Sequence, residues 1–189
     1  ISNLIISGVG VFNTYNKLIK NELSIKYGFK KDLNLVKPSV AHGCLYIGLK
    51  GNAKELKLPK NNLWIYPEST DHDQSVKDYL ENQDAEFPLV YVSFPSAKDP
   101  SWDSRYPGKS TIDVITLLPY ESFVKWEGTS WKKRGEEYEK FKEKISKRLL
   151  EHLFKQLPHL RNNIDHYELS SPLSTKNFVN YDKGELYGL

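Results

Sequence analysis

Sulfur-containing residues are almost absent, since the 189-residue sequence has one cysteine, Cys44, and no methionine. A single thiol excludes an internal disulfide and any zinc site that is built from several thiolates. Cys44 lies in the apolar stretch HGCLYIGL, which indicates a buried structural thiol rather than a nucleophile. Because the chain starts at Ile1 and lacks methionine, we expect it to be a fragment or a processed part of a longer protein.

Long apolar runs and a strong net charge are also missing. No stretch reaches the ~18 apolar residues of a membrane-spanning helix, and no secretory signal pattern is visible. The net charge of +3 is too small to indicate a nucleic-acid partner. Basic residues concentrate at 132–148, but glutamates are interleaved with them, which favours a solvated helix face. Peripheral contact with a membrane surface is the alternative interpretation of this segment.

The tetrapeptide Gly-Lys-Ser-Thr at 108–111 matches the end of a phosphate-binding loop. That motif requires a first glycine five residues before its second glycine, where this chain has Asp103. Pro107 also lacks the N–H group that would contact a phosphate. Since an apolar, β-branched stretch follows rather than a helix, we predict that the tetrapeptide is the turn that enters a strand.

Hydrophobic periodicity predicts an α+β fold, with a mostly antiparallel sheet flanked by helices, in a single domain spanning 1–189. The helix at 135–157 is the clearest element, because acidic residues cluster at its start and Pro158 follows its end. The predicted strands are 4–7, 42–49, 62–66, 87–94, 111–118 and 164–169. The other predicted helices are 12–19, 71–83 with Asp71 or Asp73 as cap, 120–126, and 174–181 with Ser174 as cap.

Candidate catalytic and metal-binding groups do not form a specific motif. The five histidines include no pair at the His-x-x-x-His spacing of a helical zinc site, so we predict no bound metal. There is no Gly-x-Ser-x-Gly nucleophile motif, and the carboxylates are scattered, so no catalytic residue is assigned. Gly8 and Gly10 match half of a dinucleotide-binding fingerprint, but Asn13 occupies the position of the third glycine.

Aromatic residues are abundant, at 13% of the chain, and several lie on predicted strands. Packing in the core is the expected role for most of them. Another role is to line a slot for an elongated apolar molecule, since ligand pockets are mostly apolar and aromatic. Alternation along the strand at 87–94 places Leu89, Tyr91 and Ser93 on one face and Val90, Val92 and Phe94 on the other. The aromatic residues on predicted strands are Tyr46, Trp64, Tyr66, Tyr91 and Phe94.

The stretch FPSAKDPSWDSRYPGKST at 94–111 is unusual enough to carry a resemblance. It is preceded by GVFNTYNKL and LKLPKNNLWIYPESTDHDQSVKDYL, and followed by LPYESFVKW, SPLST and GELYGL. In this order the segments resemble the all-trans-retinol 13,14-reductases (retinol saturases), within the phytoene-desaturase and carotenoid-isomerase group of flavoproteins. The resemblance extends over essentially the whole chain.

The resemblance implies the substrate-binding domain of an FAD-dependent oxidoreductase that reduces, desaturates or isomerises a double bond of a retinoid or carotenoid polyene. NAD(P)H is one candidate electron donor. FAD would be bound by a further domain of the same protein, so we expect none to bind this chain alone. Residues 1–20 would return from that domain, with Gly8 and Gly10 near the flavin, and residues 172–189 would lead back towards it.

The apolar stripe of the long helix, Glu136 to Gln156, must be buried, so we expect this helix to cover one sheet face. The resemblance implies that the other face fronts the flavin and the polyene. The residues expected to line the substrate are Tyr46, Tyr66, Tyr91, Phe94 and Tyr187. The expected location is the cytoplasm or a membrane surface in a bacterium, and the endoplasmic reticulum membrane in a eukaryote. The alternative function is a non-catalytic binding or structural module without flavin chemistry of its own.

Overall fold

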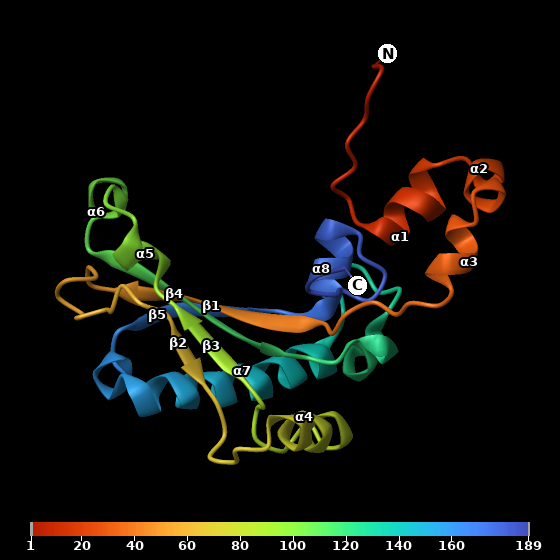
Figure 1. Cartoon of the computed structure of the whole chain (residues 1–189). Helices are drawn as coiled ribbons and strands as arrows, with labels where there is room; N and C mark the ends of the chain where they lie inside the picture. The colour runs from red at the N-terminus through yellow and green to blue at the C-terminus, as the bar shows by residue number, and fades with distance from the viewer. Residues whose placement is uncertain (1, 189) are drawn as a thin grey trace.

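A computed structural model describes residues 2–188, and its centre is a five-stranded antiparallel sheet (Figure 1). The strand order is β2-β3-β4-β1-β5. The two longest strands, β1 and β4, pair from His42 opposite Leu117 to Lys50 opposite Lys109. The predicted α+β fold with a mostly antiparallel sheet is therefore confirmed. The strands are β1 (His42–Lys50), β2 (Leu63–Ile65), β3 (Val90–Ser93), β4 (Lys109–Leu117) and β5 (Ile164–Ser170).

Alternation of side chains gives the sheet one buried face and one accessible face. On the buried face, Leu45 and Ile47 of β1 and Ile112 and Val114 of β4 are at most 2% exposed. Helix α7 (Glu136–Gln156) runs along this face, and α4 (His72–Glu81) lies on the same side (Figure 1). Most of the hydrophobic core of the described residues thus lies between the sheet and α7.

Helix α7 forms a wall of the core because its apolar residues share one face, where Ile145 and Leu149 are buried. On the outer side, Lys140 pairs with Glu136 at 2.7 Å, one helical turn away. Gly135 precedes the helix with a φ of 90°, a conformation that favours glycine. Three glutamates in the first turn complement the positive end of the helix dipole. The predicted helix and its solvated basic face are both present.

Shorter helices stand at the two ends of the sheet. Helices α5 (Pro95–Lys98) and α6 (Trp102–Arg105) follow β3 at one end, and α8 (Pro172–Val179) follows β5 at the other (Figure 1). Strand β4 begins at Lys109, so the Gly-Lys-Ser-Thr tetrapeptide enters a strand as predicted. The remaining elements are α1 (Val11–Asn13), the π-helical turn η1 (Thr14–Leu18), α2 (Asn21–Lys26), α3 (Phe29–Leu33), and the 3-10 helices η2 (Tyr120–Trp126) and η3 (Pro158–Leu160).

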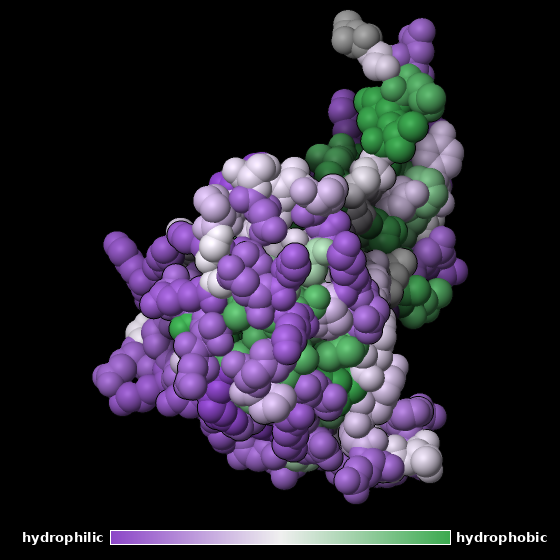
Figure 2. Space-filling view, turned by 90° about the vertical axis from the view of Figure 1, so that its left-hand side faces the viewer, coloured by the Kyte–Doolittle hydropathy of each residue, from purple (hydrophilic) through white to green (hydrophobic). Residues whose placement is uncertain are grey.

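The N-terminal part of the chain lies away from the sheet, as an extended segment followed by α1, α2 and α3 (Figure 1). Figure 2 shows apolar side chains gathered on this segment at the top of the view. No helix within residues 2–188 combines the length and the apolar character needed to cross a bilayer. The most exposed large apolar residues of the N-terminal part are Leu4, Ile5, Ile6, Leu18, Ile25, Tyr27 and Leu35, each at least 61% exposed.

Two local predictions are wrong. Residues 4–7 form no strand, because no neighbouring strand supplies the backbone hydrogen bonds that a strand needs. The cap of α8 is Ser171 rather than Ser174: the two side chains form a capping box, in which Ser174 accepts from the Ser171 N–H group at 3.2 Å. Pro172 occupies the first helical turn, so the helix starts two residues earlier than predicted.

A close approach at Gly43 holds β1 against the chain that follows β4. A Cβ atom at Gly43 would lie 2.2 Å from Leu118 Cδ1 and 3.3 Å from the Ser170 carbonyl oxygen. Since Leu118 is 2% exposed, its side chain would have to shift within a packed core to make room for any residue larger than glycine.

Candidate functional site

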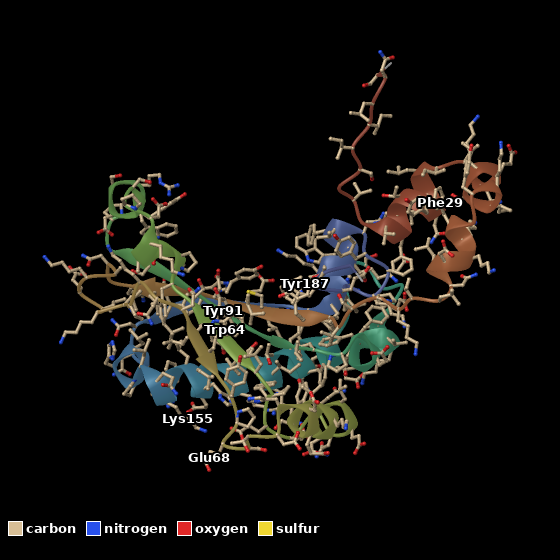
Figure 3. All side chains as sticks on the ribbon, in the orientation of Figure 1. Phe29, Trp64, Glu68, Tyr91, Lys155 and Tyr187 are labelled. Atoms are coloured by element: carbon tan, nitrogen blue, oxygen red, sulfur yellow. The ribbon has the colours of Figure 1, made fainter. Side chains whose placement is uncertain are left out.

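The accessible face of the sheet, opposite α7, is the most distinctive surface of the protein, and we call it the open face. It is bounded by α5 and α6 at one end of the strands and by α8 at the other (Figure 1). Figure 3 shows Trp64 and Tyr91 close together, between the two ends of the face, and Tyr187 towards α8. The residues that alternation and register place on it are His42, Cys44, Tyr46, Trp64, Tyr91, Ser93, Asp113, Ile115, Leu117, His166, Glu168 and Ser170.

An apolar row of side chains crosses the open face from one edge of the sheet to the other. Trp64 of β2 lies opposite Tyr91 of β3, Tyr91 opposite Ile115 of β4, and Ile115 opposite Cys44 of β1. Ser170 of β5 completes the row beside Cys44. The Trp64 and Tyr91 rings meet edge to face, with centroids 4.8 Å apart. The row is thus built from large apolar side chains at its β2 and β3 end.

A polar row runs parallel to it, displaced by two residues on each of β3, β4, β1 and β5. Ser93 of β3 pairs with Asp113 of β4, Asp113 with Tyr46 of β1, and Tyr46 with Glu168 of β5. Lys98 of α5 donates a hydrogen bond to the Ser93 hydroxyl at 3.0 Å, which brings a cation to one end of this row. The open face therefore carries apolar and polar groups in separate, parallel rows.

Three adjoining cavities follow the open face, and together we call them the groove. The apolar cavity, of about 310 Å³, includes Trp64, Tyr91, Ile115, Leu117 and Tyr187. The middle cavity, of about 470 Å³, shares two residues with it, His42 and Leu186, and lies against α8. The third cavity, of about 340 Å³, shares Tyr46 with the middle cavity. It is lined by Tyr46, Thr111, Asp113, His166 and Glu168, among others.

Partial burial shifts the pKa of several groups on the open face. Burial, with a contribution from the Asp113 charge, raises the pKa of Cys44 to about 12. Burial likewise raises the pKa of Tyr46 to about 12 and that of Asp113 above its ordinary value, while nearby Lys98 partly offsets the shift at Asp113. Burial lowers the pKa of His42, whose Nδ1 atom is buried without a hydrogen-bond partner among the described residues. At neutral pH these shifts favour uncharged Cys44, Tyr46 and His42.

The structure brings together three of the five residues expected to line a substrate. Tyr46, Tyr91 and Tyr187 line the groove. Tyr66 lies outside it, with its ring 5.0 Å from that of His72 at the start of α4. Phe94 is 0% exposed and belongs to the core on the other face, so it does not line the groove.

Several groove residues were missed by sequence reasoning. Ile115 and Leu117 alternate with core residues along β4, so their position on the second face could have been read from the strand pattern. The same holds for His42 on β1, but Leu186 could not be predicted, because its segment reaches the groove through a long-range pairing. The Leu186 N–H group donates to the Val40 carbonyl at 3.0 Å.

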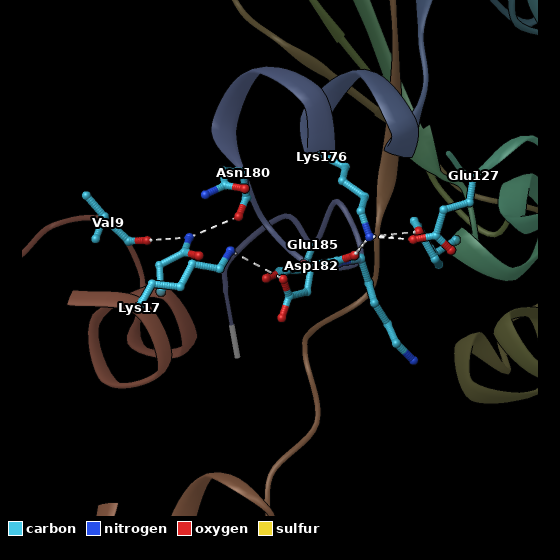
Figure 4. A network of polar contacts seen from close by, with 10 residues as sticks. Val9, Lys17, Glu127, Lys176, Asn180, Asp182 and Glu185 are labelled. Carbon is cyan, nitrogen blue, oxygen red and sulfur yellow. Dashed lines mark hydrogen bonds and ion pairs between the residues drawn. The ribbon is translucent and has the colours of Figure 1, made fainter. Parts of the chain in front are cut away.

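A polar network joins the N-terminal helices to the C-terminal segment (Figure 4). The Asn13 side-chain amide donates to the carbonyl oxygens of Val9 and Asn180, both at 3.0 Å. Lys17 pairs with Asp182 at 3.7 Å. These contacts connect the two segments that were expected to lead to and from a flavin domain.

Gly8 and Gly10 do not form a dinucleotide-binding turn in the described part of the chain. Such a turn joins a strand to a helix, but no strand precedes Gly8 and α1 has only three residues. Gly10, with a φ of 87°, packs instead against the Tyr181 ring, whose Cε1 atom would lie 3.0 Å from a Cβ at this position. These residues by themselves do not fit the diphosphate of FAD.

Metal-ligating side chains are not clustered either. Within residues 2–188, no group of three or more His, Cys, Asp or Glu side chains could hold a metal ion. Two histidines have other contacts: His159 Nε2 lies 2.9 Å from the Leu56 carbonyl oxygen, and the His152 ring packs 5.6 Å from that of Phe87.

Comparison with known proteins relates nearly the whole chain to all-trans-retinol 13,14-reductases and to a prolycopene isomerase. It is 32% identical to the all-trans-retinol 13,14-reductase of Homo sapiens over 189 residues, 98% of this chain. It is 28% identical over 177 residues to the inactive all-trans-retinol 13,14-reductase of Danio rerio. It is 27% identical over 186 residues to the chloroplastic prolycopene isomerase of Arabidopsis thaliana. No protein-family model matches the chain.

The chain spans 31%, 29% and 27% of the lengths of these three relatives, respectively, so each relative is more than three times as long as this chain. The resemblance of 94–111 and its flanking segments to the retinol reductases, within the carotenoid-isomerase group, is confirmed.

Proposed function

We propose that this relative of the all-trans-retinol 13,14-reductases forms the substrate-binding domain of an FAD-dependent oxidoreductase that acts on a polyene double bond. The observation that carries the proposal is the groove on a sheet face that the chain's own helices leave open. A cavity of about 310 Å³ lined mostly by apolar and aromatic side chains has the character of a small-molecule site.

The chain's own residues would bind and orient the polyene. Flat rings at Trp64 and Tyr91 offer contact area to a flat conjugated chain, and Ile115 and Leu117 would exclude water from it. The flavin, when bound, supplies hydride exchange with a carbon of the double bond. We assign its binding to another part of the protein, with residues 1–20 and 172–189 as connecting segments and Gly8 and Gly10 near the flavin. NAD(P)H is a candidate electron donor.

This assignment predicts that the chain alone does not bind FAD, because the described residues offer no strand–turn–helix cradle for its diphosphate. The fluorescence anisotropy of FAD is expected to stay unchanged when micromolar chain is added. Stoichiometric binding would mean that the segment around Gly8 and Gly10 suffices for the cofactor.

Polyene binding is tested by titrating all-trans-retinol into the protein and following energy transfer from tryptophan to the ligand. Ile115→Asp places a charge in the apolar cavity and is expected to weaken binding at least ~10-fold, because ligand binding would bury that charge. Val124→Asp is the matched control, since Val124 is 45% exposed on η2, outside the groove. Equal affinities of both variants and the parent would contradict the proposal.

The alternative is a binding or structural module without catalytic activity. One observation supports this alternative: a relative named as an inactive reductase matches 92% of this chain. Retinol binding to the groove in a full-length protein that does not turn it over would support this alternative.

We further propose that the protein contacts a membrane peripherally, through α2 and α3 rather than through α7. Between residues 17 and 37 the chain has six lysines and two acidic residues. Exposed apolar side chains, such as Ile25 and Tyr27 at 61% each, accompany these lysines. A basic and apolar surface suits anionic lipid headgroups, whereas several of the α7 lysines are paired with nearby carboxylates. The membrane would be that of the endoplasmic reticulum in a eukaryote; in a bacterium the protein would be cytoplasmic or on the inner membrane surface.

Cosedimentation with vesicles tests this surface. Binding to vesicles that contain phosphatidylserine should fall strongly when Lys26, Lys30 and Lys31 are all changed to Glu. The matched control changes Lys140, Lys144 and Lys147 of α7 to Glu and should retain binding. Equal loss in the two triple variants, or equal binding of the parent to neutral vesicles, would contradict this assignment.

A further inference from the structure

We propose that Asp113, at the centre of the open face, is the general acid of the proposed reaction and donates the proton that completes reduction of the double bond. This inference rests on the proposed function and deepens it for the same groove. It gives a catalytic role to a residue that sequence reasoning did not single out.

Reduction of a carbon–carbon double bond needs a proton as well as a hydride. The π bond breaks, and one carbon forms a C–H bond with the hydride, whose two electrons the proposed function assigns to reduced FAD. The other carbon forms a C–H bond with a proton. In the proposed step the O–H bond of the Asp113 carboxyl group breaks, and its electron pair stays on the carboxylate oxygen. The carboxylate then regains a proton from water at the open face.

The fold places Asp113 where such a proton is needed. Strand β4 is the middle strand of the five, and Asp113 lies on it between Ser93 of β3 and Tyr46 of β1. It lines the third cavity, and Ile115 of the apolar cavity follows it by two residues on the same face, ~7 Å away. A polyene that packs on Ile115 and extends along β4 therefore brings carbon atoms to the Asp113 carboxyl group.

Three carboxylates of the described residues line the groove, and Asp113 differs from the other two. Glu168 is exposed on the edge strand β5. Glu185 is 2% exposed, but one of its oxygens already accepts a hydrogen bond from the Lys183 N–H group at 2.9 Å. Asp113 is half-buried, and nearby Lys98 acts on it through its charge, while the Lys98 hydrogen bonds go to Ser93 and Asn62.

A general acid must hold a proton that it can release. Burial raises the pKa of Asp113, and a bound polyene would displace water and raise this pKa further, which favours the neutral carboxyl group. Tyr46 and Cys44, each with a pKa of about 12, hold their protons too tightly for this role. The lowered pKa of His42 leaves it mostly without a proton to donate.

The first test is the pH dependence of binding, which needs no turnover. All-trans-retinol is titrated into the protein between pH 5 and pH 8, with energy transfer from tryptophan as the signal. Binding that raises the Asp113 pKa takes up a proton, so the affinity should fall about tenfold as the pH rises, for a shift of about one pKa unit. In Asp113→Asn, which cannot titrate, the affinity should stay constant within about twofold.

The sign of this dependence separates Asp113 from the histidines of the groove. Loss of water disfavours the charged form of His42 and His166, so their titration would strengthen binding as the pH rises. A fall in affinity with rising pH therefore reports on a carboxyl group. The titratable or charged groups that face Asp113 are Lys98 from α5, Cys44 and Tyr46 from β1, and His166 and Glu168 from β5.

The second test measures turnover of retinol by the full-length protein with reduced FAD. Asp113→Asn should turn over retinol at least ~100-fold more slowly, with its affinity at pH 5 unchanged, because a general acid contributes about 100-fold or more. Asp113→Glu restores a carboxyl group and should recover part of the rate. Asp165→Asn is the matched control, since Asp165 lies on β5 outside the residues that line the three cavities and pairs with Lys50 at 3.2 Å.

The control should keep both the pH dependence and the rate of the parent, and circular dichroism should show that each variant remains folded. If the parent binds retinol equally at pH 5 and pH 8, or if Asp113→Asn keeps the pH dependence or the rate, the role of Asp113 is overturned while the polyene groove stands. If retinol does not bind the parent at any pH, the proposed function itself fails, and this inference with it.

Discussion

A buried hydrogen bond between α7 and α8 is expected to stabilise the end of the groove. The Tyr138 hydroxyl lies 2.7 Å from the Ser171 hydroxyl, and the two residues are 3% and 0% exposed. Ser171 caps α8, which borders the middle cavity. Replacement of Tyr138 by Phe keeps the ring against Trp126, whose centroid is 5.3 Å away, and removes only the hydroxyl.

The expected cost of Tyr138→Phe is about 1–2 kcal/mol in the free energy of unfolding. A net intramolecular hydrogen bond contributes about 1 kcal/mol, and a buried group that loses one of its partners adds to the cost. Ser171 keeps one partner, the backbone N–H group of Ser174, which limits the loss. The value should be measured by urea denaturation, with far-UV circular dichroism as the signal.

Tyr167→Phe is the matched control. The Tyr167 hydroxyl makes a hydrogen bond of nearly the same length, 2.8 Å, but to Glu143, which is partly exposed to water. Water can replace that contact, so the control should lose less than about 0.5 kcal/mol. A double-mutant cycle of Tyr138→Phe with Ser171→Ala should give a coupling of about 1 kcal/mol. Equal losses in the two Tyr variants, with no coupling in the cycle, would refute the reasoning.

Three further outcomes follow from burial and packing. Burial raises the pKa of Tyr79 from 10 in the unfolded chain to about 12 in the folded protein. The contribution of this shift to the free energy of unfolding is therefore complete below pH 10 and is lost as the pH rises towards 12. Tyr79→Phe should therefore lose less stability than the parent between about pH 9 and pH 11 in urea titrations; parallel losses would contradict this. The high pKa of Cys44 should make alkylation slow in the native protein and fast in denaturant, and rapid native labelling would contradict its burial. Gly43→Ala should cost about 1–3 kcal/mol through its clash with Leu118, and an unchanged denaturation midpoint would show that the core yields more easily than expected.

Local sequence patterns were sufficient for most elements of secondary structure. The helix at 135–157 follows from its apolar stripe, its acidic start and Pro158, and the structure has α7 at Glu136–Gln156. Asp71 caps α4, accepting a hydrogen bond from the Gln74 N–H group at 2.9 Å. Such signals act between residues a few positions apart, so they are present in the sequence itself.

The faces of individual strands could also be predicted, because side chains alternate with a period of two. Along β3 and its C-terminal neighbour, Val90, Val92 and Phe94 are buried and Tyr91 lines the groove. Alternation grouped Phe94 with Val90 and Val92, and all three are core residues. The expectation that Phe94 lines a substrate slot followed its residue type rather than this pattern.

The groove itself depended on tertiary structure. Its rows combine residues from strands that are far apart in sequence, such as Tyr46 between Asp113 and Glu168, and this register is set by backbone pairing across the sheet. Tyr187 reaches the groove because the C-terminal segment returns to the residue before β1, where Glu185 pairs with Ala41. Local propensity holds no information about such pairings, since their hydrogen bonds form between segments that meet only when the chain folds.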